Sequence, residues 1–107
     1  MAKYLLIESR DRFESSDESY WKIAMDLRKA GNEVTLFFVQ NGVLTTRRGP
    51  KSQGLIDIKE AGVTMLADDF SLRERGIAKD RMVEGIEVSP LDVVIDQMAE
   101  GAKTIWH

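Results

Sequence analysis

Two adjacent carboxylates, Asp68 and Asp69, follow the short apolar run "VTMLA" (63–67) and open a segment of helical character. In an α/β protein, ligands and catalytic groups gather just past the carboxyl end of a buried strand. Carboxylates there can act as acid and base, bind a cation, or accept the free N–H groups of a helix start. We expect helix capping ahead of catalysis, because adjacent side chains point in different directions and rarely share one ion.

Three arginines are the other candidate ligand-binding residues. Arg47 and Arg48 lie in a glycine-rich connection over 40–54, and Arg75 ends the segment that Asp69 opens. Guanidinium groups bind carboxylate, phosphate or sulfate through paired hydrogen bonds. For Arg47 and Arg48, a solvated charge cluster on an exposed loop is the more ordinary interpretation. The candidate pocket therefore consists of Asp68, Asp69, Arg47, Arg48 and Arg75.

Several common chemistries lack the residues they require. The sequence has no cysteine, which excludes a disulfide framework, a thiolate metal site and a cysteine nucleophile. The segment after the first apolar run (9–18) has no glycine with which to cradle a phosphate. The single histidine, His107, is the last residue and could simply fray, so neither a Ser-His-Asp triad nor a metal centre is expected. We predict no cofactor and no bound metal.

The composition is that of a globular protein with one domain over residues 1–107. Hydrophobic residues make up 43% of the 107 residues and charged residues 31%. The net charge of −3 argues against nonspecific binding to nucleic acid. No apolar run is long enough to span a membrane, and the first ten residues lack the apolar core of a signal peptide. A cytoplasmic location is expected.

Apolar runs and helical patterns alternate along the chain. This alternation predicts an α/β fold: a single three-layer α/β/α domain with a mainly parallel five-stranded sheet, flavodoxin-like in outline. The last helix should turn Leu91, Val94, Ile95 and Met98 inward. The expected strands cover 3–8, 33–39, 63–67, 86–89 and 102–107, and the expected helical segments cover 16–31, 55–62, 69–76, 79–85 and 90–101.

Three segments taken together resemble the DsrE/DsrF/DsrH-like family, which includes the TusB, TusC and TusD sulfur-relay proteins. "FFVQNGV" (37–43) is similar to that family's second strand and its following Gly-Val. "AGVTMLADDFSLRERGI" (61–77) is similar to its third strand, site loop and Arg-Gly helix end. "KDRMVEGIEVSPLDVVIDQMAEGAKTIWH" (79–107) is similar to its C-terminal helix and strand. The resemblance runs from the first strand to the last and implies the family's fold.

The resemblance also locates a departure from the family pattern. The family's sulfur-carrying members place a cysteine about eight residues before the glycine of the Arg-Gly pair. Counting back from Gly76 puts Asp68, or a neighbour, at that place. A carboxylate cannot hold a persulfide, because sulfur transfer requires a thiolate. The resemblance therefore implies the fold and an oligomeric habit, with trimers or hexamers common, but not the transfer of sulfur.

Two functions remain open at this point. The first is a non-catalytic DsrE-like binding or assembly protein, forming a homo-oligomer or joining related DsrE-like subunits. The alternative is a small-ligand or cation-binding protein, or an enzyme, that uses Asp68 and Asp69 with the neighbouring arginines. A subunit that assembles with others exposes an apolar surface when it is alone. We expect that surface to include Trp21, Phe13 and several methionines, and expect Trp106 at the end of the sheet or in a subunit interface.

Overall fold

A computed structural model of the chain describes residues 1–11, 19–49 and 52–107. Five strands form one sheet in the order β4-β3-β2-β1-β5, and every neighbouring pair is parallel. The strands are β1 (Lys3–Glu8), β2 (Glu33–Phe38), β3 (Thr64–Asp68), β4 (Ile86–Ser89) and β5 (Lys103–Trp106). The predicted α/β class and three-layer architecture are confirmed, with a sheet that is parallel throughout.

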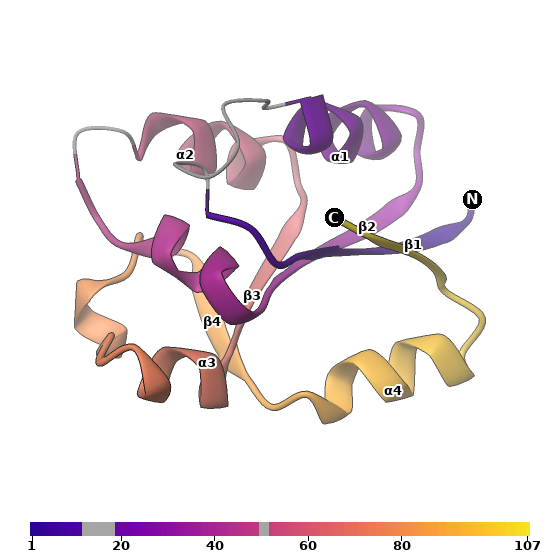
Figure 1. The fold of residues 1–107 in the computed structure, drawn as a ribbon. Helices are drawn as coiled ribbons and strands as arrows, with labels where there is room; N and C mark the ends of the chain where they lie inside the picture. The colour runs from indigo at the N-terminus through magenta and orange to yellow at the C-terminus, as the bar shows by residue number, and fades with distance from the viewer. Residues whose placement is uncertain (12–18, 50–51) are drawn as a thin grey trace.

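Helices cover both faces of the sheet (Figure 1). α1 (Ser19–Lys29) and α2 (Gln53–Glu60) lie on one face, and α4 (Asp92–Ala99) lies on the other. α3 (Asp69–Glu74) continues past the carboxyl end of β3, and its Leu72 packs in the same core as α1 and α2. Two short 3₁₀ helices, η1 (Gln40–Thr46) and η2 (Lys79–Arg81), complete the elements. Within the described residues, no helix has the length and apolar character needed to cross a membrane. Ser16 and Asp17, whose side chains are both of the type that caps a helix start, precede α1 and lie outside the described residues.

The core is divided by the sheet into a large and a small part. The large part lies beneath α1 and α2, and includes Leu36 and Phe38 of β2 with Leu55 and Ile58 of α2. The small part lies beneath α4 and consists of Leu5, Ile7, Phe37 and Val94, with a few half-buried neighbours. The central strands β1, β2 and β3 are largely apolar because both of their faces are covered, whereas the edge strand β5 is exposed along its length.

The orientation predicted for α4 is wrong at three of four residues. Val94 is buried, but Leu91, Ile95 and Met98 are each more than half exposed. The helix turns its Val93–Val94 side to β1, where these residues pack with Leu5, Ile7 and Phe37. Apolar residues occupy two sides of this short helix, and only one side can face the sheet.

The first part of the connection after β2 forms the 3₁₀ helix η1 (Gln40–Thr46). η1 buries Gly42, Val43, Thr45 and Thr46 at the carboxyl edge of the sheet. Gly42 lies so close to β1 that a Cβ atom there would be 2.1 Å from the carbonyl oxygen of Glu8. Glycine is therefore required where η1 crosses the end of β1.

Trp21 does not contribute to an exposed surface, and that prediction is wrong. Its side chain is 7% exposed and belongs to the large core. A Cβ atom on Gly54 would be 3.1 Å from its ring, so the glycine lets α2 approach α1 closely. Met65 and Met82 are also buried. Met98 is exposed, contrary to the inward orientation predicted for it, and Trp106 lies exposed on β5. Phe13 lies outside the described residues.

Candidate functional site

Asp68 is the last residue of β3 and the N-cap of α3. Its side chain is buried, and its Oδ2 accepts hydrogen bonds from the backbone N–H of Ser71 (3.0 Å) and from the Ser71 hydroxyl (2.7 Å). Such a cap contributes about 1 kcal/mol to stability. The predicted capping role of this aspartate pair is confirmed at Asp68. Ser71 and Glu74 also have the residue types of a capping box one turn later, but that box does not form, because Ser71 lies inside α3.

Ser71 links this cap to η1. Its hydroxyl oxygen accepts a hydrogen bond from the backbone N–H of Gln40 (2.8 Å), a residue with a φ of 54°. Arg75 completes the connection, because its guanidinium donates to Asn41 Oδ1 (3.0 and 3.2 Å) and to the Ser71 carbonyl (3.2 Å). β3, α3 and η1 are therefore joined by one polar network. We call Asp68, Ser71, Gln40, Asn41 and Arg75 the cap network.

Asp69 turns away from the cap network. It forms an ion pair with Arg73 one turn along α3 (3.3 Å), and both side chains are well exposed. The two aspartates therefore do not converge on one point. The residues that the structure describes contain no group of three or more His, Cys, Asp or Glu side chains placed to hold a metal ion. The geometry of the pair is that of a cap beside a surface ion pair.

Arg47 and Arg48 contact η2 and its surroundings instead. Arg47 pairs its backbone with Met82, and its Nε donates to the Leu44 carbonyl (2.9 Å). The Arg48 backbone N–H donates to Arg81 O (2.9 Å), and its guanidinium donates to the carbonyl of Asp80. The structure thus brings Asp68 and Arg75 into one network, and places Asp69 and these two arginines outside it.

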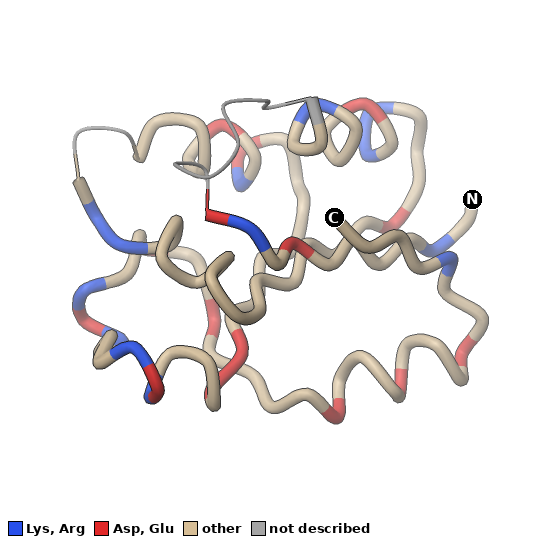
Figure 2. Tube along the Cα trace, in the orientation of Figure 1, with Lys and Arg blue, Asp and Glu red and all other residues tan. Residues whose placement is uncertain are grey.

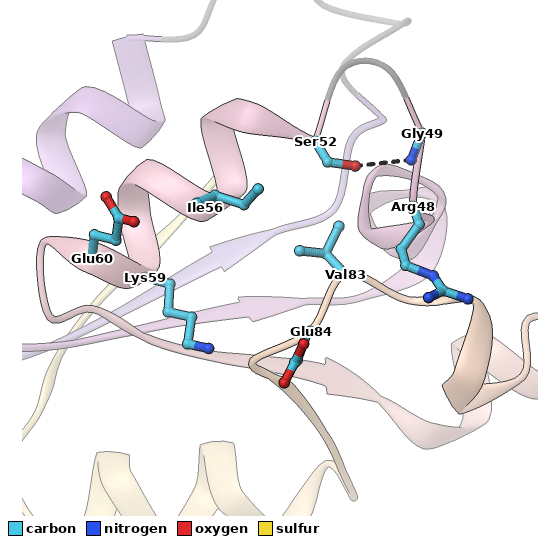
Figure 3. Close-up of a pocket in the computed structure, with 8 residues that line it drawn as sticks. All are labelled: Arg48, Gly49, Ser52, Ile56, Lys59, Glu60, Val83 and Glu84. Atoms are coloured by element: carbon cyan, nitrogen blue, oxygen red, sulfur yellow. Dashed lines mark hydrogen bonds between the residues drawn. The ribbon is translucent and has the colours of Figure 1, made fainter.

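Arg48 lines a groove between α2 and the residues that precede β4 (Figure 3). The groove has a volume of about 510 Å³. Both apolar and charged side chains line it, and they come from α2, from the residues that follow η1 and from those that precede β4. Its lining residues are Arg48, Gly49, Ser52, Ile56, Lys59, Glu60, Val83 and Glu84.

A second buried carboxylate lies at the carboxyl end of β1. Glu8 is 3% exposed, and its oxygens lie 2.8 and 3.1 Å from Nδ1 of His107. The imidazole stacks on the ring of Tyr20, with the ring centroids 4.7 Å apart. Burial raises the pKa of the Tyr20 hydroxyl well above its ordinary value, and the nearby charge of Glu8 raises it further. The expectation that His107 frays is wrong.

We predict that His107 contributes to stability through this pairing. His107→Ala should lower the free energy of unfolding by about 2 kcal/mol, since it removes a hydrogen bond to a buried carboxylate together with an aromatic stack. His107→Phe should recover part of the loss, because it restores only the stack on Tyr20. Urea unfolding monitored by circular dichroism measures both. A change below about 0.5 kcal/mol for His107→Ala would mean that the residue frays after all.

Comparison with known proteins places this arrangement in a family. The model of the DsrE/DsrF-like family matches residues 2–106. A comparison with curated proteins finds no match. Among solved structures, the chain is similar to the YchN protein from E. coli, with 21% identity, a TM-score of 0.81 and full coverage of both chains.

Two other solved structures are similar over nearly their whole length. A protein of unknown function from Methanobacterium thermoautotrophicum has 19% identity and a TM-score of 0.79, with both chains fully covered. A conserved protein of unknown function from Bacteroides thetaiotaomicron has 14% identity and a TM-score of 0.77, covering 98% of this chain and 95% of that one. At these identities the likeness shows a shared fold. Since the family model spans almost every residue, the chain belongs to the DsrE/DsrF-like family.

Proposed function

We propose that this protein is a non-catalytic DsrE-like binding or assembly protein that forms a homo-oligomer. Membership of the DsrE/DsrF-like family relates it to sulfur-relay proteins. Two features of the chain support this narrower role. The cap network engages Asp68, which lies at or next to the place that the resemblance assigns to the carrier cysteine, and an apolar surface lies exposed on α4. The exposed apolar surface on α4 is the main support for the proposal.

The exposed surface is formed by one side of α4 and the end of β5, and we call it the α4 surface. Leu91, Ile95 and Met98 recur at helical spacing, and Trp106 lies beyond them on the neighbouring strand. Trp106 pairs in register with Ile7, a member of the small core under α4, so its side chain belongs to the α4 side of the sheet. All four side chains are more than half exposed.

The size of this surface favours a protein partner. Four large side chains exposed to this degree present on the order of 400 Å² of apolar area, which is the size of patches that mark interaction sites. A specific interface needs roughly 500 Å² or more from each partner, including its polar rim. A second copy of the chain is the occupant we propose, since the small core beneath α4 leaves the sheet thinly covered on this face.

The charges on α4 favour a head-to-tail contact between copies. Figure 2 shows acidic but no basic residues along this helix, and they are Asp92 and Asp96. A contact of the α4 surface with itself would bring these like charges together. Basic residues are found instead around α3 and η2, where Figure 2 shows them in blue among acidic residues in red. A head-to-tail contact that closes on itself gives a ring, such as the trimer that the sequence resemblance implies.

The cap network supports a role without covalent sulfur chemistry. The resemblance puts Asp68, or a neighbour, at the place of the carrier cysteine, and the Asp68 carboxylate is already engaged by Ser71. No residue of the chain has a thiol. The proposed role is therefore to contribute subunit contacts, or to bind a partner, rather than to carry persulfide.

Incubation with a cysteine desulfurase and a sulfur donor tests whether the chain carries persulfide. We expect the intact mass of the chain to stay unchanged, because a carboxylate does not accept sulfane sulfur. Asp68→Cys is the informative variant, since its thiol would lie at the start of α3 beside the Ser71 N–H, which stabilises a thiolate. A stable covalent sulfur adduct on the unmodified chain would overturn the proposal.

A further inference from the structure

The groove beside Arg48 has an apolar floor. Ile56 extends from α2 toward Val83, which precedes β4 (Figure 3). Val83 is 5% exposed and packs in the large core, whereas Ile56 is 36% exposed and still offers surface to a ligand. A volume of about 510 Å³ is within the range that holds a small organic molecule. The floor alone would select only for apolar character.

Lys59 supplies a positioned cation at one side of this floor. Its side chain lies against Gly85, so closely that a Cβ atom on Gly85 would be 2.4 Å from Lys59 Cδ and 2.7 Å from its Nζ. Gly85 has a φ of 99°, a conformation that also favours glycine. Among the residues that the structure describes, no carboxylate forms an ion pair with Lys59. Its ammonium is therefore placed beside the groove without a neutralising partner.

Arg48 supplies a second oriented cation. Its guanidinium donates to the Asp80 carbonyl, which holds the side chain against η2. A guanidinium carries five N–H donors, so others remain for a ligand. Ser52, in the same lining, accepts the Gly49 N–H with its hydroxyl oxygen (2.9 Å) and keeps its own proton to donate. These groups all suit an anionic head group.

The acidic residues of the lining limit the charge of that ligand. Glu60 and Glu84 balance the formal charges of Lys59 and Arg48, and the Glu60 carboxylate points away from the floor (Figure 3). A multiply charged anion would meet repulsion from these two carboxylates, whereas a single charge could pair with one cation. We propose that this groove binds a monoanionic organic acid whose apolar body lies on Ile56 and Val83.

This inference is independent of the proposed assembly. The groove lies on the face of the sheet that α1 and α2 cover, and the α4 surface lies on the opposite face (Figure 1). It uses neither the cap network nor a thiol. Arg48 contacts η2, near the proposed head-to-tail contact. The test therefore uses Lys59 of α2, whose substitution should leave the oligomeric state unchanged.

Titration of the ¹⁵N-labelled protein with octanoate, followed by NMR, tests this site. We expect saturable shifts of the Ser52, Ile56, Lys59 and Val83 amides. Octanamide has the same chain without the charge, and should bind at least about fivefold more weakly, a difference of roughly 1 kcal/mol. Inorganic phosphate should not compete. Octanoate shifts that fail to saturate, or that map only to the α4 surface, would overturn the proposal.

A pair of charge-matched variants completes the experiment. Lys59→Gln should weaken octanoate binding at least about fivefold. Lys29→Gln removes the same charge from α1, outside the groove lining, and should bind as the unmodified protein does. Both lysines are exposed, so both variants should fold. Equal weakening in the two variants would show a nonspecific charge effect and would contradict the assigned site.

Discussion

Ile95→Lys is expected to dissociate the oligomer into single chains. Ile95 lies in the middle of the α4 surface and is 64% exposed, so the substitution adds a charge without disturbing the core. In an assembled protein the same side chain would be buried against a neighbouring copy, where an unpaired ammonium is strongly unfavourable. Light scattering coupled to size exclusion measures the result as a fall in mass to that of one chain.

Ile23→Lys is the matched control for this effect. Ile23 is an isoleucine on α1, 45% exposed, and α1 covers the opposite face of the sheet. The control introduces the same charge at a similar exposure, so it should leave the mass of the assembly unchanged. Both variants should keep the far-ultraviolet circular dichroism of the folded protein. If Ile95→Lys assembles as the unmodified chain does, the α4 surface is not the subunit interface.

Asp68→Ala is expected to destabilise the protein by about 2 kcal/mol or more. The change removes the N-cap of α3 and leaves the Ser71 N–H and hydroxyl without their buried acceptor. Asp68→Asn should be nearly silent, because the amide oxygen can accept the same bonds and asparagine caps about as well as aspartate. Urea unfolding of the two variants measures the difference between them.

Asp69→Ala provides the neighbouring control. It removes only an exposed ion pair with Arg73, so its effect should stay within about 0.5 kcal/mol. The alternative role of this pair, cation binding, would give a different pattern. A rise in melting temperature with divalent metal, lost in Asp68→Asn, would show that Asp68 does more than cap α3.

The three central strands were accessible from sequence because each is a short, largely apolar run between polar turns. The order of the strands was not, since pairing depends on contacts between distant segments. The side of α4 that faces the sheet could not be predicted either. Its sequence carries an apolar side through Val93 and Val94 and another through Leu91, Ile95 and Met98. Periodicity cannot say which of these sides faces the sheet.

In the candidate site, too, local features could be predicted from the sequence and contacts between distant segments could not. The cap at Asp68 follows from local sequence, because an aspartate between a strand and a helix has few other places for its side chain. The partners of the cap network follow from tertiary structure, since Ser71 and Gln40 are 31 residues apart. The pair of Glu8 and His107 is separated by 99 residues and matches no local pattern. Such contacts become visible only when the sheet brings β1 and β5 together.

The mass of the unmodified protein in solution tests the central claim most directly. Light scattering across a wide range of concentrations should give a multiple of the mass of one chain, three or six chains for a closed ring or a pair of rings. The value should hold as the protein is diluted well below the concentration at which weak contacts persist. A mass of one chain at every concentration would contradict the proposed assembly.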